Sequence, residues 1–302
     1  MVSEQQPFSF SKNGTKMINS KTSFLALIGN PVGHSLSPIM HNAAIKFLDL
    51  DLVYLAIPCK EKDFETVINA LKKINCKGLN ITIPFKEKAF NLCEELSPIA
   101  KRVKAINTLK INDKLEWSGT NTDIDGFLHP IKDLDLLGKK SIVIGSGGAA
   151  RSAVQGLIDQ KLSEIQVISR NESGLKNFLN DFKSFKPVKG FLVNKKDTDK
   201  LINQSDLIIN ATPIGMKNFK MNSDELPFGE DFWQSLNPQT IVYDLVYNPR
   251  LTRLLRYAEK KGCQIIDGSE MLVAQGAKSL SYWTGIEEIP IEIMKQAINK
   301  YL

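Results

Sequence analysis

The segment NITIPFK, residues 80–86, places one lysine beside two neutral hydrogen-bonding side chains. We expect a strand over residues 78–83, and because side chains alternate between the two faces of a strand, Asn80 and Thr82 would face one cavity. Pro84 favours the first turn of a helix, where its missing N–H leaves no bond unmade. Lys86 would then project from fixed backbone. It is a candidate reaction centre, although a single lysine is more often a solvated surface residue.

Hydroxyl groups gather in a second segment, GNPVGHSLSP at residues 29–38, which joins an expected strand to an expected helix. It brings Ser35 and Ser37 to a helix N-terminus, a place that suits a substrate carboxylate. Ser37 also fits an ordinary N-cap before a proline, whereas Ser35 has no such structural explanation. The segments AINT, residues 105–108, and GTNTD, residues 119–123, add amides, hydroxyls and one carboxylate. A protein that holds several ring hydroxyls needs such groups.

Apolar periodicity predicts the elements that position these groups. Strands and helices are expected to alternate over residues 24–29, 37–47, 52–57, 64–71 and 78–83. This βαβαβ order predicts a mostly parallel sheet covered by helices, with a hairpin at residues 108–118 attached to it.

The same alternation restarts after Gly126 and predicts a second doubly wound unit. The strands expected there are residues 141–145, 165–169, 206–210 and 241–245, and the helices include residues 154–158, 175–182 and 251–261. From Gly268 the pattern is helical almost to the end, over residues 271–282 and 291–301. A tail with no strand of its own must pack on something, and we expect it to return to the first unit.

The glycine-rich segment GSGGAAR, residues 145–151, lies between an expected strand and an expected helix. Gly145, Gly147 and Ala150 follow the dinucleotide fingerprint, in which glycines let the backbone approach a pyrophosphate at the helix N-terminus. This context favours nucleotide binding over a purely structural glycine turn.

The end of the next strand indicates which nucleotide. NAD-binding chains commonly have an acidic residue there for the ribose, whereas this chain has Ser169, Arg170 and Asn171. An arginine can pair with a 2′-phosphate and stack on adenine, so NADP(H) is favoured over NAD(H); the alternative is an arginine that faces solvent. Thr212, in the segment NATPIGM at residues 210–216, ends a later strand at the edge where ligands bind in such folds. A plain strand exit would give the same pattern.

Composition narrows the classes of function. The 39 basic and 33 acidic residues are interspersed, so the net charge of +6 suits anionic small substrates and offers no basic tract for nucleic acid.

No apolar stretch approaches the roughly 20 residues that span a bilayer. Residues 1–22 are polar and favour a disordered extension over a targeting peptide, because they lack arginine and contain Glu4. The four cysteines are scattered, which favours free thiols in a reducing cytoplasm. The histidines fit no usual zinc spacing, so we expect structural roles and no metal for His34, His41 and His129.

Seven motifs, taken in order, closely resemble those of the shikimate dehydrogenase family: GNPVGHSLSP, NITIPFK, AINT, GTNTD, GSGGAAR, NATPIGM and DGSEMLVAQGA, the last at residues 267–277. The resemblance covers about residues 24–285. It implies an α/β protein of two doubly wound domains. Residues 23–125 and 268–302 would form a substrate-binding and catalytic domain, and residues 126–267 a Rossmann-type NADP-binding domain. The implied activity is reversible NADPH-dependent reduction of 3-dehydroshikimate to shikimate, on the chorismate route to aromatic amino acids, in the cytoplasm.

The resemblance also implies roles for individual residues. Lys86 and Asp123 look like the catalytic pair, and both would contact the substrate. Around the substrate, the implied residues are Ser35 and Ser37 at the carboxylate, Thr82, Asn107, Asp123 and Gln275 at the hydroxyls, and Tyr247 nearby. Around the cofactor, they are Gly145, Ser146, Gly147, Gly148 and Ala149 at the pyrophosphate, Arg170 at the 2′-phosphate, and Leu245 and Gly268 along the nicotinamide. Ser169, Asn171 and Thr212 complete the predicted cofactor contacts.

Two positions depart from the family pattern. Gly174 stands where many NADP-binding members carry a second basic residue, with Lys176 beyond it, which predicts weaker selectivity for NADP. Pro98 stands where relatives often have an acidic residue, and we expect a modest effect on the cleft.

As a hypothesis, hydride from NADPH reaches the ring ketone while Lys86 donates a proton to the developing alkoxide, and Asp123 holds the hydroxyl and the lysine in line. An ordinary lysine, with a pKa near 10.4, is a poor base at neutral pH. Lys86 could therefore exchange the proton in a site that eases its release, or act mainly as an electrostatic stabiliser.

Two alternatives stay open. One is a quinate/shikimate dehydrogenase with relaxed use of NAD and NADP. The other is a catalytically silent NADP-binding sensor, which would have no need for Lys86 and Asp123 together with two serines and Gln275. A monomer and a homodimer are equally compatible with the sequence.

Overall fold

The computed structural model describes residues 17–302 except residues 186, 194 and 218–223. The extension expected over residues 1–22 falls mainly on residues 1–16, which lie outside the described residues. Within the described part of the chain, no helix has both the length and the apolar character needed to cross a bilayer.

The first half of the chain builds a mixed sheet in the order β2-β1-β3-β5-β6-β4. Its strands are β1 (Ser23–Gly29), β2 (Leu52–Pro58), β3 (Cys76–Ile81), β4 (Glu95–Leu96), β5 (Thr108–Ile111) and β6 (Trp117–Thr120). The helices along this part are α1 (Ser37–Phe47), α2 (Phe64–Leu71), α3 (Lys86–Leu92), α4 (Pro98–Val103) and α5 (Asp123–Leu128), with a 3₁₀ turn η1 (Glu61–Asp63). The central strand β1 pairs in parallel with β2 and β3, whereas β5 runs antiparallel to β3 and β6.

The second sheet is entirely parallel, in the order β12-β11-β10-β7-β8-β9. Its strands are β7 (Lys140–Ile144), β8 (Glu164–Ser169), β9 (Val188–Leu192), β10 (Leu207–Asn210), β11 (Ile241–Asp244) and β12 (Gln264–Ile266). The helices that connect them are α6 (Gly148–Asp159), α7 (Glu172–Asp181), α8 (Lys195–Asn203) and α9 (Arg253–Lys260), with η2 (His129–Ile131) before β7 and η3 (Glu230–Trp233) before β11. This is the strand order of the dinucleotide-binding fold. Successive strands are added outward from β7 on one side and then from β10 on the other, so the switch point lies between β7 and β10.

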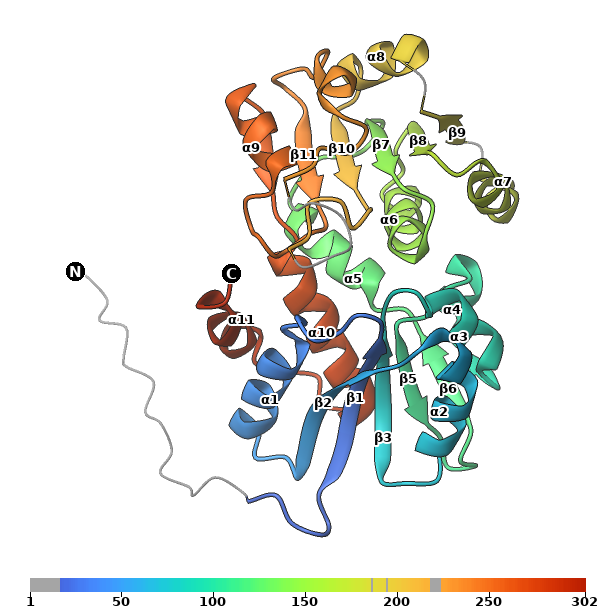
Figure 1. Ribbon diagram of the computed structural model, residues 1–302, viewed down its shortest axis with the longest axis vertical. Helices are drawn as coiled ribbons and strands as arrows, with labels where there is room; N and C mark the ends of the chain where they lie inside the picture. Colours follow the sequence, from blue (N-terminus) through green and yellow to red (C-terminus); the bar gives the residue numbers. More distant parts are fainter. Residues whose placement is uncertain (1–16, 186, 194, 218–223) are drawn as a thin grey trace, which may run out of the picture.

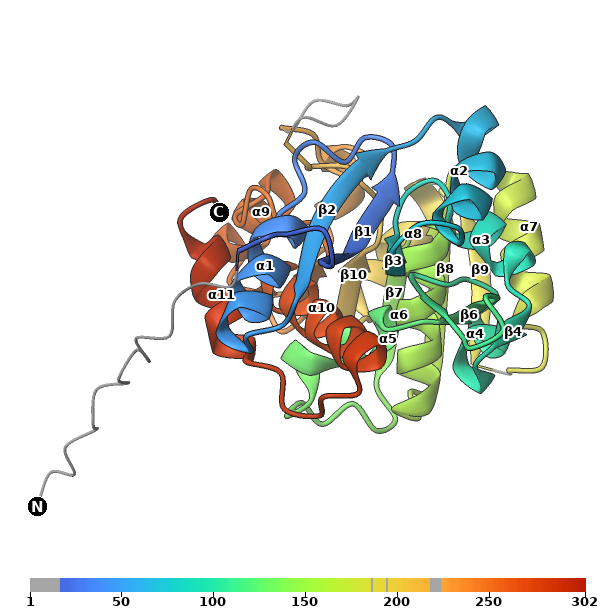
Figure 2. The same cartoon turned by 90° about the horizontal axis from the view of Figure 1, so that it is seen from below.

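Both faces of β1 are buried, as the unbroken apolar run FLALIG predicts for a central parallel strand. Leu25 and Leu27 pack in a cluster with α1 and the C-terminal helices α10 (Ser269–Thr284) and α11 (Ile291–Asn299). Ala26 and Ile28 pack in another with α2 and α3. Figure 2 shows these two groups of helices on opposite sides of the sheet. Strand alternation therefore distributes the core between two helical layers.

Helix α10 joins the two units. Figure 1 shows the sheets one above the other, with α5 between them and α10 extending from this boundary along the first sheet. Trp283 on α10 donates from Nε1 to the Leu109 carbonyl at 2.8 Å, over Gly78 of β3. A Cβ at Gly78 would lie 2.2 Å from that nitrogen, so this contact requires glycine. The predictions of two doubly wound α/β units and of C-terminal helices that return to the first are confirmed.

The segment around Lys86 differs from expectation. Strand β3 ends at Ile81, so Thr82 lies just beyond it, and α3 begins only at Lys86. Pro84 lies in a turn that Phe85 N–H closes on the Thr82 carbonyl at 2.9 Å. Pro84 therefore belongs to the turn between β3 and α3 and does not start the helix.

Some edge elements were not predicted. The second hairpin strand starts at Trp117, because Leu115 takes a positive φ of 59° in the turn. Strands β4, β9 and β12 were missed, and so were helices α4, α5 and α8. These strands are short or partly exposed and lack a buried apolar run, so periodicity gives little signal for them.

Candidate active site

A cavity of about 190 Å³ lies between the two units. All eight residues predicted to contact the substrate line it: Ser35, Ser37, Thr82, Lys86, Asn107, Asp123, Tyr247 and Gln275. Three residues predicted to contact the cofactor line it too: Ala149, Leu245 and Gly268. The structure therefore brings the predicted substrate residues into one chamber bordered by the dinucleotide turn.

The centre of the chamber holds an ion pair between Lys86 and Asp123, each the first residue of a helix. Lys86 Nζ lies 2.5 Å from Asp123 Oδ2, and the two side chains are 15% and 6% exposed. The Lys86 carbonyl accepts from Ile106 N–H at 3.1 Å, which ties the start of α3 to the loop before β5. The pair is shielded from bulk water, which strengthens its electrostatic interaction.

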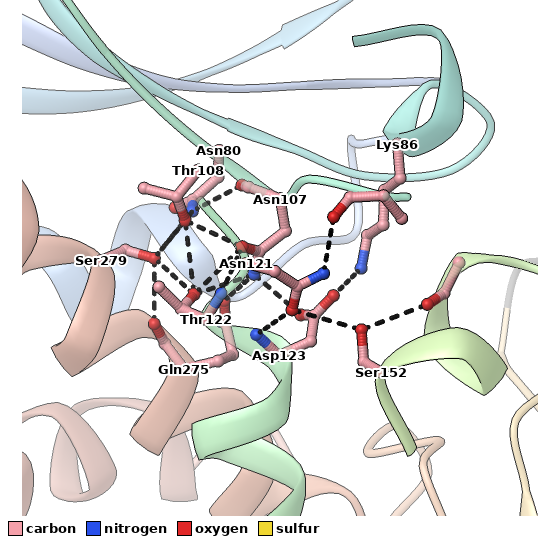
Figure 3. Close-up of polar contacts among 12 residues, drawn as sticks. Asn80, Lys86, Asn107, Thr108, Asn121, Thr122, Asp123, Ser152, Gln275 and Ser279 are labelled. Atoms are coloured by element: carbon pink, nitrogen blue, oxygen red, sulfur yellow. Dashed lines mark hydrogen bonds and ion pairs between the residues drawn. The ribbon is translucent and has the colours of Figure 1, made fainter. Parts of the chain in front are cut away.

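Asn107 fixes the other oxygen of Asp123. Its Nδ2 donates to Asp123 Oδ1 at 2.8 Å, while its Oδ1 accepts from Thr122 N–H at 2.8 Å. Because a backbone N–H can only donate, this second bond determines which end of the amide faces Asp123. Figure 3 shows the carboxylate held between Lys86 and Asn107, so its position is fixed from two sides.

A buried hydroxyl cluster supports Asn107 from behind. Ser279 Oγ lies 2.8 Å from Thr108 Oγ1 and 3.0 Å from Thr122 Oγ1 (Figure 3). Asn80 donates to Ser279 Oγ at 3.0 Å and accepts from the Tyr54 hydroxyl at 2.7 Å. Asn80 and Thr82 line the same cavity, as predicted, but the amide of Asn80 is bonded to protein groups.

Sequence reasoning missed Ser279. One signal could have found it: Ser279 follows Gln275 by four positions on a predicted helix, so both share one helical face.

Ser35 and Ser37 form the candidate carboxylate site. Their hydroxyls lie 3.2 Å apart, and Ser37 N–H donates to Ser35 Oγ at 3.2 Å. The N-cap of α1 is Leu36, with no side-chain cap bond, so the ordinary N-cap explanation for Ser37 is wrong. Burial raises the pKa of the nearby Tyr247 phenol, and its hydrogen bonds with Ser35 and the Leu36 backbone oppose that shift. Three neutral hydroxyls therefore meet at one end of the chamber.

The histidines lie apart from one another. His41 is buried and stacks on Tyr54 with ring centroids 4.2 Å apart, and burial lowers its pKa to about 3, so it is a neutral core side chain. His129 lies 3.9 Å from a Glu270 oxygen. His34 lines the chamber, which sequence reasoning missed, although its place before Ser35 in the motif was a signal.

The glycine turn after β7 fits a pyrophosphate. Gly145 has a φ of 111°, and a Cβ there would lie 3.1 Å from Thr212 Cγ2 at the end of β10. The N-cap of α6 is Gly147, which offers no side chain to the first-turn N–H groups, and a Cβ there would meet no atom within 4 Å. The helix N-terminus therefore opens onto space at the reversal point of the sheet, where an anion is stabilised.

Arg170 lies apart from the chamber, exposed, at a second cavity of about 540 Å³. Its neighbours Ser169 and Asn171 are used structurally. Ser169 Oγ accepts from Asn171 N–H at 3.1 Å, and Asn171 Oδ1 caps α7 by accepting from Gly174 N–H at 3.0 Å. Arg253, also at this cavity, is paired with Glu230 at 2.6 Å. Among the described residues that line the second cavity, Arg170 is therefore the cation outside an ion pair.

The two departures from the family pattern have structural correlates. A Cβ at Gly174 would lie 3.2 Å from Asn171 Cγ, so a side chain there would crowd the α7 cap. Lys176 pairs with Glu172 at 2.8 Å on the exposed face of α7. Pro98 opens α4 behind the Ser97 cap and does not line the chamber.

A buried carboxylate, Asp244, lies beneath the cofactor side of the site at the end of β11. It accepts from Asn210 Nδ2 at 2.9 Å, from Val246 N–H at 3.1 Å and from the Thr252 hydroxyl at 2.7 Å. Burial raises its pKa to about 7 despite these donors. Asp244 therefore titrates near neutral pH within the wall that carries Thr212 and Leu245.

Known proteins resemble the chain over nearly its whole length. Family models described as the shikimate dehydrogenase substrate binding domain and the shikimate 5′-dehydrogenase C-terminal domain match residues 27–109 and 268–298. A shikimate dehydrogenase (NADP(+)) from Prochlorococcus marinus subsp. pastoris is 60% identical, with 95% of this chain and 100% of the relative covered.

Two solved structures share the fold of this chain over nearly its whole length. A shikimate dehydrogenase in complex with NADP+ is 34% identical, with a TM-score of 0.84 over 96% of this chain and 99% of that one. The shikimate 5-dehydrogenase from Listeria monocytogenes in complex with shikimate and NAD is also 34% identical, with a TM-score of 0.81 over 94% and 99%.

We predict that Asp244 makes stability depend on pH. A carboxyl whose pKa is higher in the folded state stabilises the fold while it is protonated, and this contribution is lost as pH rises from about 4 to about 7. Relative to Asp244→Asn, the wild type should lose about 3 kcal/mol of unfolding free energy between pH 5 and pH 8. Urea denaturation of both proteins at the two pH values measures this, and an equal difference at both would contradict it.

Proposed function

The chain belongs to the shikimate dehydrogenase family, and we propose that it catalyses the reversible, NADPH-dependent reduction of 3-dehydroshikimate to shikimate in aromatic amino acid biosynthesis. The observation that carries this proposal is the shielded Lys86–Asp123 ion pair in a chamber that also borders the dinucleotide turn. A proton donor beside a hydride donor is what carbonyl reduction requires.

The proposal assigns substrate binding to residues 23–125 with residues 268–302, and cofactor binding to residues 126–267. The family model of the substrate binding domain, at residues 27–109, supports this division. The four free cysteines fit a reducing cytoplasm as the place of action.

The chamber has two polar ends that match a cyclic hydroxy acid. Ser35, Ser37 and Tyr247 offer hydroxyl donors to the carboxylate. The ring hydroxyls then meet Thr82, Asn107 and Gln275, whose amide and hydroxyl groups can donate and accept. A neutral clamp recognises the anion without placing a second cation beside Lys86.

When bound at the Gly145–Gly148 turn, NADPH supplies the hydride for the ring ketone. Lys86 Nζ donates a proton to the developing alkoxide oxygen, and its positive charge stabilises that oxygen before the proton moves. Asp123 accepts a hydrogen bond from the same hydroxyl and keeps Nζ directed at it. In the oxidation direction, Lys86 takes the proton back.

The decisive test is turnover of 3-dehydroshikimate, followed by NADPH consumption. We expect rapid loss of NADPH absorbance, and its absence at high enzyme concentration would refute the proposal in favour of a silent sensor. Oxidation rates on shikimate and quinate, each with NADP+ and NAD+, measure the selectivity of the enzyme for substrate and for cofactor. Gly174 favours some use of NAD(H), because Arg170 lacks the usual second basic residue.

Lys86→Met should lower kcat by roughly 10²- to 10⁴-fold, the usual contribution of proton transfer, with a smaller effect on KM for 3-dehydroshikimate. Methionine keeps the methylenes that pack beside Gly148 but carries no proton. Lys88→Met is the matched control, since Lys88 lies on the same helix and pairs with the exposed Glu61 at 2.6 Å. Turnover that survives Lys86→Met within a few-fold would exclude this role.

Arg170→Ala should raise KM for NADPH by roughly 10- to 100-fold, because a charge-assisted bond to the 2′-phosphate is lost. KM for NADH should stay unchanged, since NADH carries no 2′-phosphate. Lys176→Ala serves as the control, because its partner is Glu172. An equal rise in KM for NADPH and NADH would show that Arg170 contacts the adenine or stabilises the fold, and does not bind the 2′-phosphate.

A further inference from the structure

One face of α6 rests directly on the catalytic residues. Gly148, Ser152 and Gly156 recur at every fourth position and so share that face. A Cβ at Gly148 would lie 3.1 Å from Lys86 Cδ, and one at Gly156 would lie 3.0 Å from Phe127 Cδ1 on α5. The helix that begins at the dinucleotide turn is therefore in contact with both catalytic helices, α3 and α5.

Ser152 makes the polar contact of this face. Its hydroxyl donates to Asn121 Oδ1 at 3.2 Å, across the boundary between the two units, and it also lies 3.2 Å from the Gly148 carbonyl of its own helix. Both Ser152 and Asn121 are buried. A hydroxyl has one proton, and both distances exceed the usual 2.7–2.8 Å of such bonds. The one proton of this hydroxyl can therefore point either to the acceptor on its own helix or to the one on the catalytic unit.

Asn121 links Ser152 to Asp123. Its Oδ1 accepts from Asp123 N–H at 3.0 Å, and its Nδ2 donates to the Ala105 carbonyl at 3.0 Å. These backbone partners determine the orientation of the amide, so its oxygen must face Ser152. Figure 3 shows this chain of contacts running from Ser152 through Asn121 to Asp123, which in turn contacts Lys86.

We propose that Ser152 is a positioning residue that couples cofactor binding to the placement of Asp123. The proposal rests on the proposed function, because it needs both ligands. An anion at the N-terminus of α6 holds the first turn of the helix, and substrate holds Asp123 against Lys86. When both the first turn of α6 and Asp123 are held, the Ser152 hydroxyl donates to Asn121 alone. This hydrogen bond then stabilises the ternary complex more than either binary complex.

The test compares shikimate binding to the protein with and without saturating NADPH, by calorimetry; shikimate and NADPH are both already reduced, so this ternary complex cannot react. Ser152→Ala should weaken shikimate binding to the NADPH-loaded protein by roughly 5-fold, the worth of one ordinary hydrogen bond. Binding of either ligand alone should stay within about 2-fold of wild type. Ser205→Ala is the matched control, because Ser205 is also buried and donates to the carbonyl four residues back, at 2.7 Å, within the cofactor unit.

A second comparison tests whether Ser152 acts through Asn121. In the Asn121→Ala background, Ser152→Ala should cause no further loss of ternary affinity or of kcat. Ser152→Cys, which fills the site with a weaker donor, should give an intermediate loss and serves where the alanine variant does not fold.

The proposal would be overturned by either of two results in Ser152→Ala: an unchanged ternary affinity, or equal losses in binary and ternary binding. It would also be overturned if the losses added to those of Asn121→Ala, or if Ser205→Ala had the same effect. A wild type that neither binds shikimate nor turns over 3-dehydroshikimate would instead refute the proposed function, and the coupling with it.

Discussion

The arrangement of the site depends on keeping one ion pair, Lys86 with Asp123, largely out of water. Charges in such a place are costly unless their remaining hydrogen-bonding capacity is satisfied. Asn107 bonds the second carboxylate oxygen, and Asn121 bonds the backbone N–H of Asp123. A pair held in this way is ready before substrate arrives, so little reorganisation is needed when charge develops on a substrate oxygen.

The groups that satisfy the pair come from distant parts of the chain. Asn80 lies near the end of β3, Thr108 begins β5, and Ser279 comes from α10, yet they share one buried cluster. Such networks are stable only when every member is bonded, because a buried polar atom without a partner costs free energy. The same cluster therefore orients the catalytic carboxylate and joins the last helix to the first sheet.

The sequence predicted the larger features because each has a local signal. Buried strands are apolar runs, and the glycine turn at Gly145 needs a strand before it and a helix after it. That the substrate residues gather in one place could be predicted only from the ordered family motifs, because no local sequence pattern indicates that Lys86 pairs with Asp123. Ser152 was missed because a serine inside a helix has the same sequence pattern whether it faces solvent or a buried amide, and for Ser279 the spacing of four positions from Gln275 was the one available signal. The end of β3 was misjudged because Pro84 suits both a turn and a helix start, and only the surrounding contacts distinguish them.

The contact of Trp283 with the Leu109 carbonyl also bears on how the protein is made, because the two residues are 174 positions apart. One face of the first sheet is covered by α1 together with α10 and α11, and these last two are synthesised after the second sheet, which is formed by an uninterrupted stretch of chain. During synthesis, the nucleotide-binding unit can therefore form most of its core, to which α10 later adds Met271, while the earlier strands still expose apolar side chains. Folding of the substrate unit waits for α10 and α11, so a product that stops before them would contain a dinucleotide turn but no finished catalytic chamber.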